Sequence, residues 1–166
     1  MSTIDNLRDA FAGESQANRR YLAFAAKADQ EGFPQVARLF RAAAEAETVH
    51  ALNHLRILKE IGSTEENLGA AVKGETYEFR QMYPKFLEEA KREKRQDAAW
   101  SFDVANKVEE VHAKLYSKAL EALKARGRPG MVEYYVCQVC GNTVEREAPE
   151  KCPVCGAPRD KFRRIE

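Results

Sequence analysis

Two stretches, Ala46-Glu-Thr-Val-His50 and Val108-Glu-Glu-Val-His112, contain the pattern that decides the fold. Each holds a glutamate and a histidine three residues apart, and the second pair follows the first by 62 residues. Residues three apart on a helix share a face, so each pair can direct a carboxylate and an imidazole at one point. Helical bundles that hold two metal ions combine two such pairs with a lone glutamate from each of two other helices. The spacing therefore predicts an all-α four-helix bundle around a metal site.

The pattern of apolar residues and helix breakers predicts four long helices followed by a small domain. They run from Ser2 to Glu31, from Pro34 to Ile61, from residues 64–66 to Arg95, and from Gln96 to Ala125. Gly62 is expected to stop the second helix, Ser63-Thr64-Glu65-Glu66 to cap the third, and Pro84 to kink it. Gly127-Arg128-Pro129-Gly130 is expected to form a linker. The predicted domains are residues 1–130 and 131–166.

Further glutamates fall on the predicted inner faces. Glu14 lies midway along the first helix, and Glu75 and Glu78 lie three apart on the third. With the two pairs they give five carboxylates and two imidazoles. Five carboxylates in a bundle core would be severely destabilising or would take up protons, whereas two hard cations neutralise most of their charge.

Two other residues near this set have open roles. His54, seven residues after Glu47, is either a hydrogen-bonded core residue or a metal ligand. Tyr21, seven residues after Glu14, is either ordinary core or a hydrogen-bond donor to a ligand carboxylate, since buried phenols seek partners.

The C-terminal segment contains two Cys-x-x-Cys turns within 19 residues. The four cysteines can form a tetrahedral thiolate site for iron or for zinc; they are Cys137, Cys140, Cys152 and Cys155. The spacing alone leaves a structural zinc ribbon open. A nearby site that cycles between redox states favours iron, because such a site needs an electron source.

Composition excludes several classes of function. Residues 1–133 carry 21 basic and 21 acidic residues and residues 134–166 carry 6 and 5, so neither nucleic acid nor an anionic membrane surface is an expected partner. No apolar run approaches the roughly 20 residues of a transmembrane helix. The N-terminus has no basic leader followed by an apolar core, so the expected location is cytoplasmic.

At these positions the chain resembles rubrerythrins over nearly its whole length. The stretches that carry the resemblance are Phe11-Ala-Gly-Glu-Ser15, Ala46 to His50, Gly74-Glu-Thr-Tyr-Glu78 with Met82-Tyr-Pro84, Val108 to Tyr116, and the cysteine pairs with Ala148-Pro149. The resemblance implies a ferritin-like bundle with a non-haem di-iron site, followed by a rubredoxin-like domain with one iron on four cysteines. Zinc is the alternative occupant of the cysteine site in overexpressed protein.

The resemblance also implies a role for each residue of the site. Glu47 and Glu109 would bridge the irons, Glu14 and Glu78 would bind one iron, and Glu75 and His112 the other. His50 would take up the first iron when it leaves Glu78 on reduction, and Tyr21 and Tyr83 would hydrogen-bond to ligand carboxylates. Asn142 departs from the pattern, where an aromatic residue is common. We expect it to expose the cysteine-bound iron more, without removing a ligand.

The implied activity is reduction of hydrogen peroxide to water. Electrons would arrive through the cysteine-bound iron from an NAD(P)H-dependent reductase, directly or through a soluble rubredoxin. The chain has no dinucleotide-binding fingerprint, so the reductase would be a separate protein. The alternatives are a ferroxidase or iron-handling bundle, and a non-enzymatic interaction protein with a structural zinc ribbon.

The short predicted connection between the second and third helices has a consequence for assembly. Ferritin-like bundles need a long crossover at this point, and the residues around Gly62 span about 10 to 24 Å where about 36 Å is required. We therefore expect a homodimer in which the helix pairs are exchanged between two chains.

Overall fold

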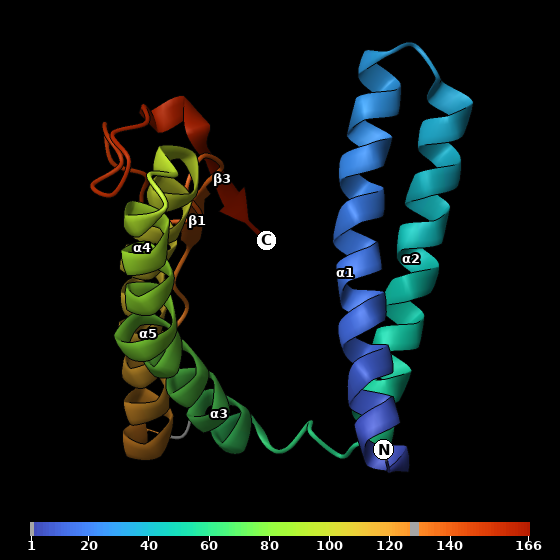
Figure 1. Cartoon of the computed structure of the whole chain (residues 1–166). Helices are drawn as coiled ribbons and strands as arrows, with labels where there is room; N and C mark the ends of the chain where they lie inside the picture. Colours follow the sequence, from blue (N-terminus) through green and yellow to red (C-terminus); the bar gives the residue numbers. More distant parts are fainter. Residues whose placement is uncertain (1, 127–129) are drawn as a thin grey trace. The chain divides into compact units, whose positions relative to one another are not determined.

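The computed structural model describes residues 2–126 and 130–166. The chain is helical up to Arg126 and ends in a small sheet, as the sequence predicts (Figure 1). By their internal contacts the residues form two compact units, Met1–Gly62 and Ser63–Glu166. The predicted linker residues 127–129 lie outside the described residues, and the predicted domain boundary after residue 130 stays a prediction.

The first unit is an antiparallel hairpin of α1 (Thr3–Gln30) and α2 (Pro34–Ile57). The Ser2 hydroxyl accepts the Asp5 N–H at 3.2 Å, and the Asp5 carboxylate accepts the Ser2 N–H at 2.8 Å, so two free donors of the helix start are satisfied. Gly32, at φ +79°, turns the chain into α2. The helices meet at small buried residues, Ala25, Ala28 and Ala37, which allow close approach of the two backbones.

Helix α2 ends at Ile57, four residues before the predicted end at Ile61. The reason is Lys59, which adopts the left-handed conformation at φ +58°. The N–H of Lys59 bonds to the carbonyl of Arg56 and that of Glu60 to the carbonyl of Leu55, so the last carbonyls of the helix are satisfied. A left-handed residue other than glycine gives no clear sequence signal.

The second unit begins with α3 (Thr64–Tyr77), η1 (Glu78–Met82), α4 (Tyr83–Arg92) and α5 (Gln96–Arg126). Helix α5 packs against α3 and α4. The predicted capping sequence is confirmed, because the Ser63 hydroxyl accepts the Glu66 N–H at 3.3 Å and the Glu66 carboxylate accepts the Ser63 N–H at 2.7 Å.

The predicted third helix is not continuous. Its middle, Glu78–Met82, is a π-helical turn in which Tyr83 donates its N–H to the carbonyl of Glu78, five residues earlier. Pro84 lies in the first turn of α4, where its missing N–H costs no hydrogen bond. The irregularity predicted at Pro84 therefore lies in the turn before it.

The second unit closes with an antiparallel sheet of strand order β2-β1-β3. Its strands are β1 (Tyr134–Cys137), β2 (Thr143–Glu145) and β3 (Phe162–Ile165), with a short helix η2 (Arg159–Lys161) before β3. The central strand β1 ends at Cys137, and β2 begins just after Cys140. The sheet thus holds the first cysteine turn at its edge.

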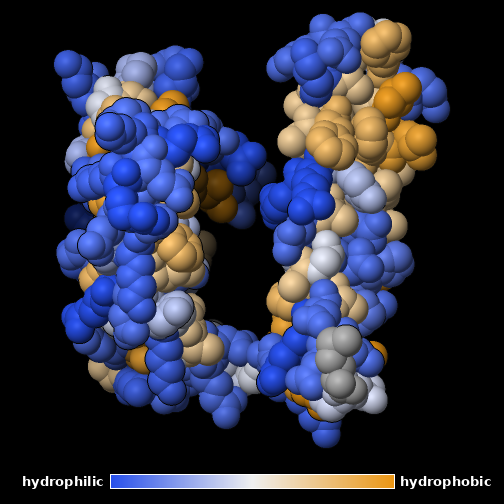
Figure 2. All heavy atoms as spheres, in the orientation of Figure 1, coloured by the Kyte–Doolittle hydropathy of each residue, from blue (hydrophilic) through white to orange (hydrophobic). Residues whose placement is uncertain are grey.

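Both units leave large apolar side chains uncovered. In the first unit, Figure 2 shows them gathered toward the end where α1 joins α2, and Phe24, Phe33 and Leu39 are 47%, 57% and 68% exposed. In the second unit, Phe86 and Trp100 are 44% and 53% exposed. Of the helices within residues 2–126 and 130–166, none combines the length and apolar composition that a membrane crossing needs.

Candidate metal centres

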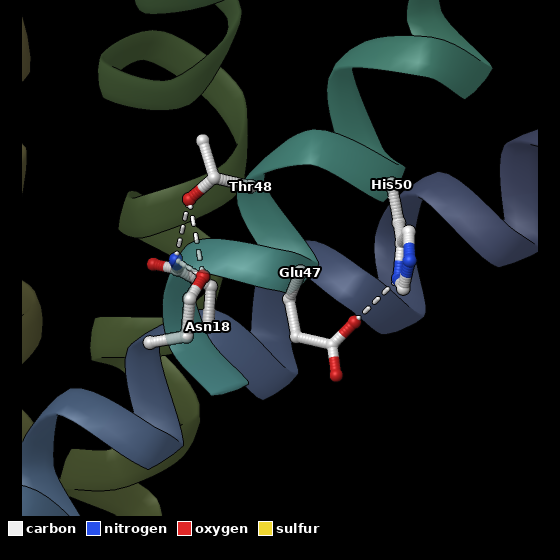
Figure 3. Close-up of polar contacts among 5 residues, drawn as sticks. Asn18, Glu47, Thr48 and His50 are labelled. Atoms are coloured by element: carbon white, nitrogen blue, oxygen red, sulfur yellow. Dashed lines mark hydrogen bonds and ion pairs between the residues drawn. The ribbon is translucent and has the colours of Figure 1, made fainter. Parts of the chain in front are cut away.

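The first hairpin brings three predicted ligands together. Glu14 on α1 and Glu47 and His50 on α2 place one ligand atom each within 4.8 Å of one another. The Nδ1 atom of His50 lies 2.9 Å from Oε2 of Glu47, so the pair three residues apart shares a face as predicted (Figure 3). Two carboxylates and one imidazole are a donor set suited to iron.

A hydrogen-bonded clamp next to this cluster holds α1 against α2. The Asn18 side-chain amide donates to the carbonyl of Ala44 at 2.7 Å and to the hydroxyl of Thr48 at 2.9 Å (Figure 3). Thr48 follows Glu47 directly, and Asn18 lies one turn after Glu14. The clamp therefore fixes the helices at the level of the ligands. The clamp was not predicted from the sequence, although the four-residue spacing from Glu14 to Asn18 places both side chains on one face of α1.

The second unit contains an equivalent cluster. Glu75 on α3 and Glu109 and His112 on α5 also place their ligand atoms within 4.8 Å of one another. The Nδ1 atom of His112 lies 2.7 Å from Oε2 of Glu109 and 3.9 Å from Oε1 of Glu75. Six of the seven predicted carboxylate and imidazole ligands thus fall into two groups of three, one in each unit, and Glu78 belongs to neither group.

The electrostatics of the second cluster show a surplus of negative charge. Burial, then a hydrogen bond with Glu109 and its charge, raise the pKa of Glu75 to about 7. The hydrogen bond from His112 lowers the pKa of Glu109, and the same bond raises the pKa of His112. Without a cation, the cluster holds protons at positions that a metal ion would replace.

Glu78 and Tyr83 lie at the two ends of the π-turn, beside this cluster. Burial and the charge of Glu109 raise the pKa of Glu78. Burial, followed by the charges of Glu109, Glu78 and Glu75, raises the pKa of Tyr83. All of these groups therefore face the same region, and the Tyr83 phenol stays protonated at neutral pH.

The two residues with open roles are placed as follows. Tyr21 packs against Phe24 and Phe40, with ring centroids 6.4 and 6.1 Å apart, and its hydrogen bond to a carboxylate stays a prediction. His54 is half-buried on α2 and belongs to neither ligand cluster of the described residues. This placement favours the core role for His54.

The outer nitrogen of His112 contacts the C-terminal sheet. Its Nε2 atom lies 2.9 Å from the hydroxyl of Thr143, which donates to the carbonyl of Gly141 at 3.3 Å. A hydroxyl has one proton, so Thr143 accepts from the Nε2–H of His112. The Nδ1 atom, 2.7 Å from Glu109, is then the nitrogen that carries no proton in the neutral imidazole, and it can act as a metal ligand. The sequence contained no signal for this contact.

The four cysteines fit a single metal ion. Their sulfurs lie within 4.8 Å of one another, at 3.7 Å between Cys137 and Cys155 and 3.6 Å between Cys140 and Cys152. A tetrahedral site with metal–sulfur bonds of about 2.3 Å has edges of about 3.8 Å. Burial raises the pKa of the Cys140 thiol above its usual range, so a cation is needed to hold this sulfur as a thiolate at neutral pH.

Two glycines make the cysteine turns possible. Gly141 and Gly156 take φ values of +82° and +76°, and each donates its N–H to the carbonyl of the first cysteine of its turn, at 2.8 and 2.9 Å. Asn142 is 1% exposed, and the expected greater exposure of the cysteine-bound iron stays a prediction.

Comparisons with known proteins match nearly the whole chain. The family model described as Rubrerythrin matches residues 5–120, and the one described as Rubrerythrin, rubredoxin-like domain matches residues 135–163. Rubrerythrin-2 of Clostridium acetobutylicum is 39% identical, covering 96% of this chain and 95% of that protein. Rubrerythrin of Porphyromonas gingivalis is 37% identical, with 96% and 88% covered.

A solved structure is similar as well. The partially reduced state of nigerythrin superposes with a TM-score of 0.59 at 35% identity, covering 99% of this chain and 87% of that one. The predicted fold class, a ferritin-like helical protein with a small rubredoxin-like domain, is confirmed. The donor sets described above fit the expected cofactors, a di-iron site and an iron on four cysteines.

Proposed function

The chain belongs to the rubrerythrin family, and from that premise we propose that it is a peroxidase that reduces hydrogen peroxide to water with electrons from a separate donor. Rubrerythrins are oxidoreductases, and the balance of the proposed reaction is H2O2 + 2 H+ + 2 electrons to 2 H2O. The observation that carries the proposal is the pair of glutamate–glutamate–histidine clusters in a chain that also holds a four-cysteine site.

We propose that the two clusters combine into one dinuclear centre. Glu47 and Glu109 would bridge two irons, with Glu14 and Glu78 on one iron and Glu75 and His112 on the other. His50 would be an alternative ligand to Glu78 for the first iron. The apolar side chains exposed on both units support this association, because an isolated helical hairpin cannot cover its inner face.

The helix ends support association between two chains. Glu47 lies about 15 Å before the end of α2, and Glu75 about 16 Å after the start of α3. A parallel arrangement of these helices in one bundle needs a connection of about 31 Å, whereas the segment from Ile57 to Thr64 spans at most about 25 Å. We therefore propose a homodimer in which the α1–α2 hairpin of one chain completes the site of the other.

Bound iron would supply the two electrons that cleave the O–O bond. The carboxylates would hold the two cations at one place, which would position the substrate. The raised pKa of Tyr83 keeps its phenol protonated at neutral pH, close enough to the carboxylates to feel their charge. The hydroxyl of Thr143 holds the proton of His112 on Nε2 and so keeps Nδ1 available as a ligand atom.

The four-cysteine site would return electrons one at a time. Its donor would be an NAD(P)H-dependent reductase, directly or through a soluble rubredoxin. The exposed side chain of Val139, between Cys137 and Cys140, offers an apolar contact for such a partner close to the sulfurs. The expected setting is defence against oxidative stress in the cytoplasm.

Steady-state kinetics with purified protein test the proposal. With an NAD(P)H-dependent reductase and rubredoxin, we expect peroxide-dependent oxidation of NAD(P)H in proportion to the enzyme concentration. A ferroxidase would instead take up iron in bulk without sustained peroxide turnover. A structural zinc-ribbon protein would be colourless, whereas a ferric thiolate centre is red. A red protein that does not turn over peroxide with any such donor would overturn the peroxidase proposal.

A further inference from the structure

The hairpin α1–α2 and the helices α3–α5 begin alike. Six residue types recur at a spacing of 61 positions. The residues of the first segment are Ser2, Thr3, Asn6, Leu7, Gly13 and Glu14, and those of the second, in the same order, are Ser63, Thr64, Asn67, Leu68, Gly74 and Glu75. Both segments open with a capping box of the same geometry. The first glutamate ligand of each unit therefore lies at the same distance from the start of its helix.

Beyond these glutamates the spacing changes by one residue. Six further residue types recur at a spacing of 62 positions. In the first unit they are Tyr21, Phe24, Ala28, Phe40, Glu47 and His50, and in the second, in the same order, Tyr83, Phe86, Ala90, Phe102, Glu109 and His112. The turns between the helices also match at this spacing, since Gly32 and Lys94 are both left-handed, at φ +79° and +59°. The second unit thus has one residue more than the first between its first glutamate and its tyrosine.

The structures of the two units match on both sides of that extra residue. The ring centroids of Tyr21, Phe24 and Phe40 lie 5.5 to 6.4 Å apart. Those of Tyr83, Phe86 and Phe102 lie 5.6 to 6.3 Å apart. The alanines after the tyrosines, Ala28 and Ala90, are buried alike, at 7% and 4% exposure. The extra residue has therefore not rotated the helix that follows it.

The π-turn Glu78–Met82 lies between Glu75 and Tyr83, where the extra residue must be. On a regular helix, seven residues complete nearly two turns, so Tyr21 lies almost directly above Glu14. A spacing of eight residues on a regular helix would instead turn the tyrosine about 80° away from the direction of the glutamate. A turn closed five residues back instead of four absorbs one residue without this rotation.

We infer that the π-turn is a one-residue insertion in the second of two equivalent hairpins, and that it keeps the Tyr83 phenol on the carboxylate face. Without the π-turn, Met82 would occupy that place. The phenol is then a positioning residue for Glu75 and Glu109, equivalent to Tyr21 in the first hairpin. The inference rests on the proposed function only in treating these carboxylates as ligands.

The insertion adjoins the one ligand that has no counterpart in the first hairpin. Glu78 corresponds to Ala17, 61 positions earlier. The two clusters would otherwise be equivalent, with two glutamates and one histidine each. The first residue of the π-turn thus supplies the fifth carboxylate, and the rest of the turn restores the register of the helix. This makes the two halves of the site chemically different.

Single-residue deletions in metal-free protein test the register directly. Removing the exposed Gln81 converts the π-turn to a regular turn and restores the seven-residue spacing, so Tyr83, Phe86 and Ala90 keep their places. Removing the exposed Arg20, at the equivalent position of α1, places the tyrosine six instead of seven positions after Glu14 and turns Glu14 about 100° away from the face that carries Tyr21. We expect the Gln81 deletion to shift Tm by less than about 5 °C and the Arg20 deletion to lower it at least three times as much. Equal losses in the two variants would overturn the inference.

A second variant separates the insertion from the proline. Pro84→Ala restores an N–H that favours a regular helix. If the extra residue sets the π-turn, a crystal structure of this variant retains it, with Tyr83 beside Phe86 and Phe102. A regular helix that places Met82 on the carboxylate face would show that Pro84 alone makes the turn, and would overturn the inference. Both experiments are independent of peroxide turnover, so their failure leaves the proposed function untouched.

Discussion

The Nε2 atom of His112 lies 2.9 Å from the Thr143 hydroxyl, which joins a ligand cluster on α5 to the first cysteine turn. The Thr143 hydroxyl donates its hydrogen bond to the Gly141 carbonyl, so it accepts one from the imidazole. Gly141 follows Cys140 directly. The position of His112 in the helical cluster and the conformation of the cysteine turn are therefore fixed by one side chain.

Thr143→Val should weaken metal binding at the helical site. Valine has a similar shape but cannot accept a hydrogen bond from Nε2–H. The imidazole therefore loses the partner that holds its proton on Nε2 and leaves Nδ1 available as a metal ligand. Loss of such an outer hydrogen bond typically costs about 10- to 100-fold in metal affinity. Titration of metal-free protein with Co(II), followed by visible absorption, measures the loss. Thr143→Ser keeps the hydroxyl and should stay close to wild type. If valine and serine bind Co(II) equally well, the hydrogen bond has no role.

The metal-free protein should lose stability between about pH 5 and pH 8. The pKa of Glu75 is raised to about 7 in the folded state, so its folded form binds a proton that the unfolded form has released, and stability falls as pH rises through this range. The pKa of His112 is also raised, and its contribution is lost as pH rises through the folded value. Thermal unfolding in the presence of a chelator measures the effect.

Glu75→Gln should flatten this pH dependence, because glutamine does not titrate. Glu88→Gln, at an exposed position on α4, is the matched control and should leave the pH dependence as in wild type. Metal-loaded protein should also show a weaker dependence, since a cation takes the place of the protons. A metal-free wild type whose Tm rises from pH 5 to pH 8 would contradict the assignment of raised pKa values to this cluster.

Cys152→Ser should remove the red colour and leave the helices intact. Cys152 is 3% exposed and supplies one of four thiolates, so the site loses both a ligand and its closed shape. Circular dichroism should stay near wild type, because the described helices α1 to α5 contain no residue of this site. Zinc-substituted wild type should be colourless with an unchanged fold. Reductase-driven peroxide turnover should be lost in both proteins. Turnover that persists would mean that electrons reach the helical site by another route.

The local features of the fold were predictable because their causes are local in the sequence. The pairs Glu47–His50 and Glu109–His112 depend only on helical spacing, and the Ser63–Glu66 capping box only on four adjacent residues. The cysteine turns are likewise set by short spacings and glycine. In each case the residues that make the structure lie within one or two turns of chain.

The features that were missed depend on tertiary contacts or on a comparison within the chain. The contact of Thr143 with His112 bridges 31 positions and has no pattern of its own. The end of α2 depends on a left-handed lysine, Lys59. The π-turn follows from the extra residue before Tyr83, which becomes visible only when the second hairpin is aligned with the first.

Complementation between two inactive variants should reveal how the clusters combine. Glu47→Ala removes a proposed bridging ligand from the first hairpin, and Glu109→Ala removes one from the second, so each variant alone should lose peroxide turnover and keep the red centre. If each site takes its hairpins from two chains, a mixed dimer contains one site with both substitutions and one intact site. Unfolding and refolding an equal mixture should then restore roughly a quarter of wild-type turnover, because half of the dimers are mixed and each has one working site. Each variant refolded alone is the control and should stay inactive. A mixture that stays as inactive as its components would show that each site is built from a single chain.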